Sequence, residues 1–249
     1  MQSYCNNSVF ASITLCKISK NIPENYDNRI IIRTFVIEKE KIFTLMMHYK
    51  IYDDMTPWSE ERMQMELSLV SEQRREKVMK MRNVAARQQS LTAYRLLQDM
   101  LCETYGITES PIFCTLDNGK PVILGHEDIH FNISHCKKGV ACAISDCPVG
   151  IDIECIPETV KESLAEYIFN DYELEMLHHS PTPSVVFTRL WTMKEAVVKL
   201  SGRGITGKEQ LRPLLQPVYE NHSPWIFHHI ENQELGYVCT IAENNMDCK

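Results

Sequence analysis

The sequence has no excess of positive charge and no long apolar run, and its first residues lack the basic and apolar pattern of a signal peptide. Its 249 residues carry 26 lysines and arginines against 33 aspartates and glutamates, a formal net charge of −7 at pH 7. A general nucleic-acid coat protein would be basic, so we expect no nucleic-acid partner. Without a membrane span or signal peptide, the chain is expected to be cytoplasmic and to bind no membrane.

Metal-binding cysteine pairs and a phosphate-binding loop are also missing. None of the ten cysteines forms a Cys-x-x-Cys pair, so a zinc site is not expected. Reduced thiols are expected, because disulfides are rare in large intracellular proteins. Gly202-Arg203-Gly204 lacks the pattern of a phosphate-binding loop and is interpreted as a helix cap.

Hydrophobic periodicity predicts helices and strands in both halves of the chain. Helices are expected over 59–69, 71–80, 87–102 and 183–200, with Thr182 as a cap and Gly106 and Gly202 as stops. Strands are expected over 30–37, 42–52, 131–134, 140–144 and 149–154, with a hairpin over 225–230 and 235–242. These patterns favour an α+β fold with two related halves.

The first 45 residues fit this organisation less well. A charged segment, Glu38 to Lys41, follows their β-branched run. They are either an N-terminal extension before a native start at Met46 or Met47, or an extra edge strand. We therefore divide the chain into an extension of uncertain order (1–45), an N-terminal half (46–148) and a C-terminal half (149–249) that carries the predicted metal-binding motifs.

Two segments concentrate carboxylates in apolar surroundings. Asp152 and Glu154 share one face of a predicted strand, where a divalent cation or a basic group would relieve their repulsion. Glu195 and Lys199 share a helix face with Trp191, which suggests that this face points inward. The alternative is that Asp152 and Glu154 lie on a solvent-exposed strand face and that Glu195 and Lys199 form an exposed ion pair. Together, the three carboxylates and the lysine suit Mg²⁺ held against a phosphate-bearing substrate.

Other polar residues could bind phosphate, although each taken alone is more typical of a protein surface. Ser134 and His135 end a predicted strand, and Lys120 lies in a predicted turn. Arg82 and Arg87 precede a predicted helix whose N-terminus would favour an anion.

These segments together resemble the 4′-phosphopantetheinyl transferase superfamily, in its larger, surfactin-synthetase-activating (Sfp-type) branch. The resemblance spans roughly residues 49–242, and the last two motifs carry most of its specificity. Cys136 stands where the family often has serine. In family order, the matching segments are Gly119-Lys120-Pro121, Phe131-Asn132-Ile133-Ser134-His135, Val149-Gly150-Ile151-Asp152-Ile153-Glu154 and Trp191-Thr192-Met193-Lys194-Glu195-Ala196-Val197-Val198-Lys199.

The resemblance implies a fold and a reaction. The fold would be a monomeric pseudo-dimer of two similar α+β halves with coenzyme A in the cleft between them. The enzyme would transfer 4′-phosphopantetheine from coenzyme A to a serine of an apo acyl or peptidyl carrier protein and release adenosine 3′,5′-bisphosphate. The carrier could serve fatty acid, polyketide or nonribosomal peptide synthesis.

The resemblance also implies roles for individual residues. Asp152, Glu154 and Glu195 would bind Mg²⁺, and the metal would hold the pyrophosphate of coenzyme A. Glu195 and Lys199 would be catalytic, with Glu195 acting as metal ligand, as base toward the carrier serine, or as both. Residues expected to contact coenzyme A are Arg82, Arg87, Lys120, Pro121, Ser134, His135, Lys194 and Lys199.

Two other functions stay open on the sequence alone. A non-catalytic module could bind coenzyme A or a carrier protein, but it would have no physical need for three carboxylates beside Lys199. A Mg²⁺-dependent phosphohydrolase would use the same carboxylates, but it would need a water-positioning residue that the sequence does not reveal.

Overall fold

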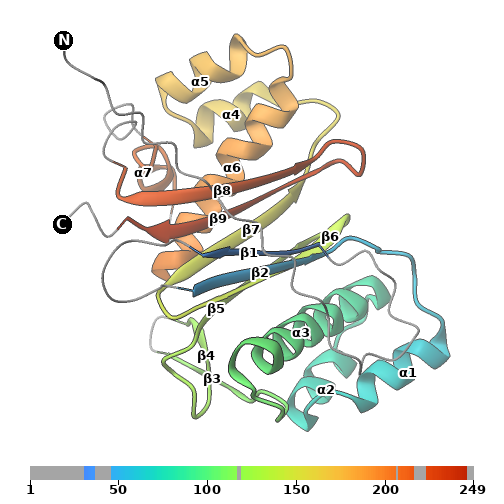
Figure 1. Ribbon diagram of the computed structural model, residues 1–249. Helices are drawn as coiled ribbons and strands as arrows, with labels where there is room; N and C mark the ends of the chain where they lie inside the picture. The colour runs from blue at the N-terminus through green and yellow to red at the C-terminus, as the bar shows by residue number, and fades with distance from the viewer. Residues whose placement is uncertain (1–30, 37–45, 117–118, 206, 216–222, 246–249) are drawn as a thin grey trace, which may run out of the picture.

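The computed structural model describes residues 31–36, 46–116, 119–205, 207–215 and 223–245, and its two larger sheets pack face to face (Figure 1). The four-stranded antiparallel sheet has the order β1 (Ile31–Val36), β2 (Met46–Tyr52), β6 (Gly139–Ser145) and β5 (His130–Cys136). The three-stranded sheet has the order β7 (Val149–Cys155), β9 (Tyr237–Asn244) and β8 (Trp225–Asn232). A small ribbon pairs β3 (Phe113–Thr115) with β4 (Pro121–Ile123).

Helices cover the outer side of each sheet (Figure 1). The helices beside the four-stranded sheet are α1 (Glu60–Ser68), α2 (Glu72–Met79) and α3 (Val84–Tyr105). Those beside the three-stranded sheet are α4 (Glu162–Ile168), α5 (Asp171–His178), α6 (Pro183–Ser201) and α7 (Lys208–Leu211). Since α3 contacts β2 and β6 while α6 contacts β7 and β9, the layers run helix, sheet, sheet, helix. This arrangement confirms a mixed α+β fold.

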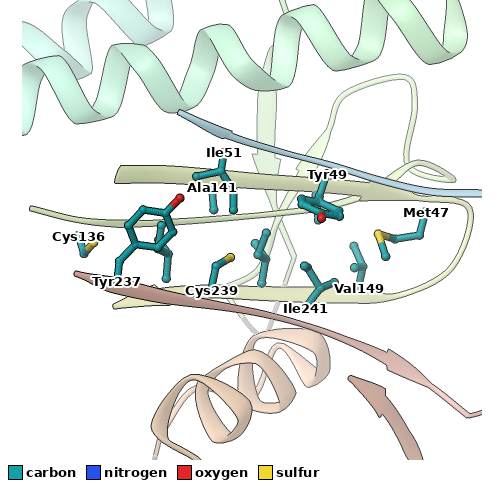
Figure 2. Packing of buried hydrophobic residues seen from close by; sticks show 12 residues of the cluster. Met47, Tyr49, Ile51, Cys136, Ala141, Val149, Tyr237, Cys239 and Ile241 are labelled. Carbon is teal, nitrogen blue, oxygen red and sulfur yellow. The ribbon is translucent and has the colours of Figure 1, made fainter. Parts of the chain in front are cut away.

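The main core lies between the two sheets (Figure 2). Met47, Tyr49 and Ile51 recur at every second position of β2 and all face this layer. They meet alternate residues of the opposite sheet, including Ile151 and Ile241. Side chains alternate along β6, so Ala141 and Ala143 face the layer between the sheets while Val140, Cys142 and Ile144 face α3. Strand β6 is therefore buried along its whole length.

Local sequence signals place the ends of the long helices. The side chains of Ser59 and Ser71 cap α1 and α2 by accepting backbone N–H groups. Gly106 and Gly202 end α3 and α6 in the left-handed conformation, at φ values of 69° and 68°. The predicted helix stops at Gly106 and Gly202 are confirmed. Thr182 stands at the start of α6 as predicted, but its side chain makes no capping hydrogen bond.

Some boundaries and short elements differ from the prediction. Helix α3 begins at Val84, earlier than expected, because the Asn83 side chain caps it by accepting from the Ala86 N–H. Strand β9 begins at Tyr237 rather than Leu235, after the turn at Gly236. The prediction did not identify β3, β4, α4, α5 and α7 as separate elements.

Residues 31–36 form β1, the outermost strand of its sheet, and pair in antiparallel register with β2. The edge-strand interpretation is therefore confirmed for these six residues. The rest of the segment 1–45 and the predicted turn residues Asp117 and Asn118 lie outside the described residues. Within the described ranges, no helix is long and apolar enough to cross a bilayer, and seven cysteines carry free thiols.

Candidate active site

A cavity of about 980 Å³ lies between β5, with the elements around it, and helix α6. One wall comes from α2, α3, the β3–β4 ribbon and β5, and the other comes from the C-terminal end of α6 and the residues after it. The wall residues Lys120, Pro121, His135, Glu195 and Lys199 were all predicted as site residues. A cavity of this volume can accept a cofactor-sized ligand.

Gly150 allows α6 to lie directly against β7. A Cβ atom at this position would come 1.9 Å from the Ala196 carbonyl oxygen and 2.7 Å from the Leu200 nitrogen. Both atoms belong to helix backbone, so any side chain would force the helix away from the strand. The close approach brings Asp152, two residues along the strand, beside Lys199 of the helix.

Asp152, Ser134 and Lys199 form a closed triangle of hydrogen bonds from β7, β5 and α6. The Lys199 ammonium donates to Asp152 Oδ1 at 2.6 Å and to the Ser134 hydroxyl at 2.8 Å. The Ser134 hydroxyl in turn donates to the same Asp152 Oδ1 at 2.8 Å. Asp152 Oδ2 is buried and accepts no hydrogen bond from the described residues.

Glu154 and Glu195 crowd the Asp152 carboxylate. Burial and the negative charge of Asp152 raise the pKa of Glu154 to about 7, and the same two causes raise the pKa of Glu195. The Trp191 side chain hydrogen-bonds Glu154, which partly offsets that rise. The structure therefore brings together the strand carboxylates and the helix residues that the sequence paired.

The chemistry of this cluster fits a divalent cation. Three carboxylates face one ammonium, and Asp152 Oδ2 has an unused lone pair in a buried position. Hard cations such as Mg²⁺ prefer carboxylate oxygens and would supply the missing positive charge. Within the described ranges, no three acidic, histidine or cysteine side chains already form a metal shell. Because Mg²⁺ usually keeps several waters and substrate oxygens as ligands, it does not require such a shell.

Lys120 and His135 lie on the cavity wall opposite Glu195, the carboxylate of α6. The Lys120 ammonium donates to the Leu200 carbonyl oxygen at 3.2 Å, and burial lowers the Lys120 pKa. Burial and then the charge of Lys199 lower the pKa of His135. His135 is therefore expected to be neutral at pH 7 when no anion is bound.

Lys194 does not reach the cavity. Its side chain is 0% exposed, and its ammonium pairs with Glu173 at 2.8 Å and donates to the Leu211 carbonyl oxygen at 2.6 Å. The Lys194 side chain lies in the core between α6, α5 and α7, since Glu173 belongs to α5 and Leu211 to α7. The predicted contact of Lys194 with coenzyme A is therefore corrected to a structural role in the core.

Arg82, Arg87 and Ser134 also lie outside the cavity lining. Arg82 is exposed, and the Arg87 guanidinium donates to the Met81 carbonyl oxygen at 2.8 Å. Ser134 is 5% exposed and turns toward Asp152. The structure thus does not bring these three predicted ligand contacts to the cavity.

Two cationic residues of α2 line the cavity, and the sequence analysis did not single them out. The Arg74 guanidinium lies over the rings of Tyr94 and Phe113, 5.0 and 5.3 Å from their centroids, and donates to Ser90. Lys77 follows three residues later and lines the same wall. Their i, i+3 spacing puts both side chains on one helix face and is the sequence signal for this wall.

Comparison with known proteins agrees with this geometry. A family model described as the 4′-phosphopantetheinyl transferase superfamily matches residues 148–242, which include β7 and α6. The 4′-phosphopantetheinyl transferase Sfp of Bacillus subtilis (strain 168) is 32% identical over 164 residues, a match that covers 65% of this chain and 72% of that protein. The chain belongs to the 4′-phosphopantetheinyl transferase superfamily.

Other members of the superfamily match over shorter stretches. The psf-1 transferase of Bacillus pumilus is 40% identical over 114 residues, which are 45% of this chain and 48% of that protein. The gsp transferase of Aneurinibacillus migulanus is 38% identical over 141 residues, with coverage of 55% and 58%. The chain thus spans from about half to almost three quarters of these relatives. They place it in the Sfp-type branch.

Proposed function

We propose that the chain transfers the 4′-phosphopantetheine group of coenzyme A to a serine hydroxyl of an apo acyl or peptidyl carrier protein. The second product is adenosine 3′,5′-bisphosphate. Relatives named for this transferase activity support the reaction. The observation that carries the proposal is the cluster of Asp152, Glu154, Glu195 and Lys199, of which Glu195 and Lys199 line a cofactor-sized cavity.

The proposed architecture is a monomeric pseudo-dimer with halves at residues 46–148 and 149–249. Support comes from the repeated pairing of one long helix with one sheet, α3 with β2 and β6, and α6 with β7 and β9. Coenzyme A would occupy the cavity between the halves, which both of them line. We propose that the protein acts in the cytoplasm, without nucleic acid or membrane as partner.

The metal proposed for this site is Mg²⁺, held by Asp152, Glu154 and Glu195. When bound, it would neutralise charge on the pyrophosphate. Cleavage of the phosphoanhydride builds negative charge on the leaving bisphosphate, and a preorganised cation lowers that barrier. Lys199 supplies such a cation, because its side chain is 28% exposed and lines the cavity while its ammonium is bonded to Asp152.

The remaining cavity wall suits the phosphates of the nucleotide. Arg74, Lys77 and Lys120 place cationic side chains around it, and His135 adds a ring N–H. Arg74 and Lys120 are partly buried, which makes their charges stronger partners for a phosphate than they would be in water, whereas Lys77 and His135 are exposed. We therefore assign the nucleotide end of coenzyme A to this wall and the pyrophosphate to the α6 wall.

Glu195 is the proposed base toward the carrier serine. Of the three proposed metal ligands, it is the one that lines the cavity. Its raised pKa brings it closer to the value at which a carboxylate takes a proton effectively near neutral pH. Metal binding and proton transfer both require the ionised carboxylate, so the two roles are compatible.

The experiment mixes the purified protein with coenzyme A, Mg²⁺ and several apo carrier proteins and follows the intact carrier mass. The account predicts a phosphopantetheine mass gain on at least one carrier, together with release of adenosine 3′,5′-bisphosphate. Nucleotide release without any carrier would favour the phosphohydrolase. Coenzyme A binding with no mass gain on any carrier would favour the non-catalytic module.

A further inference from the structure

Ser134 is the one residue of its motif that turns away from the cavity. Its neighbours Asn132, Ile133 and His135 line the cavity, whereas the Ser134 side chain is 5% exposed and points across to β7. The resemblance implied a nucleotide contact for this serine. Its burial and its two hydrogen-bond partners indicate a different task.

The Ser134 hydroxyl uses both of its hydrogen-bonding functions within the carboxylate cluster. It accepts from the Lys199 ammonium at 2.8 Å and donates to Asp152 Oδ1 at 2.8 Å. Lys199 donates to that same oxygen at 2.6 Å. Both partners of Asp152 therefore hold Oδ1, and Oδ2 is left for another ligand.

Ser134 and Lys199 differ in how firmly they can hold the carboxylate. Lys199 has a flexible four-carbon stem, is 28% exposed and faces the cavity, so it can turn toward an incoming phosphate. Ser134 has a short side chain on β5, which pairs with the fully buried strand β6. When Lys199 turns to a phosphate, Ser134 remains bonded to Asp152 Oδ1.

We propose that Ser134 is a positioning residue that fixes the Asp152 carboxylate so that Oδ2 is directed at the metal ion. This inference rests on the metal site of the proposed function, and it concerns orientation rather than contact with coenzyme A. Hydrogen-bond partners of a ligating carboxylate orient it, and their loss typically weakens metal binding about 10–100-fold. Ser134→Ala is expected to weaken metal binding by roughly that factor.

The test uses Mn²⁺ as a spectroscopic substitute for Mg²⁺ in the full-length protein. Free Mn²⁺ is measured by electron paramagnetic resonance for the wild type, Ser134→Ala, Ser134→Thr and Ser145→Ala. Ser145 is a matched control, since it is also buried on the same sheet, and its hydroxyl accepts from the Cys147 N–H, away from the carboxylates. Coenzyme A binding is measured in parallel by calorimetry in EDTA, and thermal unfolding reports on folding.

The proposal predicts weaker Mn²⁺ binding in Ser134→Ala, recovery in Ser134→Thr, and no change in Ser145→Ala. Coenzyme A binding without metal should be unchanged in all of them. Unchanged Mn²⁺ affinity in a folded Ser134→Ala protein would overturn the proposal, and so would loss of coenzyme A affinity in EDTA with Mn²⁺ affinity intact. A wild type that binds no Mn²⁺ would instead overturn the metal site of the proposed function, and this inference with it.

Discussion

At the scale of single residues, neighbouring positions of α6 have opposite tasks. Glu195 and Lys199 line the cavity, whereas Lys194 is fully buried against Glu173. Sequence spacing predicted the first pair correctly, because residues four apart share a helix face. It could not reveal that Lys194 has a buried partner twenty-one residues earlier, since that contact depends on how α5 packs on α6.

Lys194→Met should destabilise the protein without acting on the cavity. Removing one partner of a buried ion pair leaves an uncompensated charge on Glu173, which typically costs about 3–5 kcal/mol. Denaturant unfolding measures the loss, and Lys138→Met, at an exposed position, serves as control. Wild-type stability in Lys194→Met would show that the pair does not support the fold.

His135 should respond to an anion in the cavity. Burial and Lys199 lower its pKa below 6.5 in the free protein, so the ring is neutral at pH 7. A bound phosphate favours the imidazolium and should raise that pKa. NMR titration with and without adenosine 3′,5′-bisphosphate measures the change. A pKa that stays the same or falls would remove His135 from the nucleotide site.

At the scale of elements, one glycine controls the distance between β7 and α6. The pattern Gly-Ile-Asp-Ile-Glu predicted the strand, and the α6 sequence predicted the helix, so both elements could be found before the structure. The close contact between them could not be predicted, because it shows only in the structure that the backbone of α6 approaches Gly150 so closely that a side chain there would not fit. Strand β3, with three residues, and α4, with seven, were missed because so few residues show little periodicity.

Gly150→Ala should disrupt the site through the backbone. Its Cβ would meet the Ala196 carbonyl oxygen, and overpacking of this kind typically costs about 1–3 kcal/mol or more. Because Asp152 and Glu154 lie on β7 and Glu195 lies on α6, moving the helix away should also weaken metal binding. Gly139→Ala is the milder control, since its nearest neighbours would lie 3.2 Å away. Equal stability and metal affinity in the two variants would contradict this role of Gly150.

At the scale of the whole molecule, the site depends on both halves. The family model covers 148–242, yet Ser134, His135 and Lys120 come from the preceding half. The α+β class and the paired carboxylates could be predicted from sequence. The face-to-face packing of the sheets, and the cationic wall from α2, required the tertiary structure, because both join segments far apart in the chain.

Neither half should fold stably alone. One core cluster of twelve buried residues is shared between β2 and β6 on one side and β7 and β9 on the other. Separation would expose the apolar faces of both sheets to water. Circular dichroism and NMR of residues 149–249 should show no cooperative fold, and mixing with 46–148 should restore structure. A stable isolated C-terminal half would contradict the shared core.

The central claim is that Asp152, Glu195 and Mg²⁺ act together in phosphopantetheine transfer. The most direct measurement is the intact mass of an apo carrier protein after incubation with coenzyme A and either the wild type, Asp152→Ala or Glu195→Gln, each with Mg²⁺ or EDTA. We predict a rapid mass gain with the wild type in Mg²⁺ and none in EDTA. Both variants should fold, and in Mg²⁺ they should transfer the group at least about 100-fold more slowly than the wild type. Near-normal transfer by either folded variant, or by the wild type in EDTA, would contradict the claim.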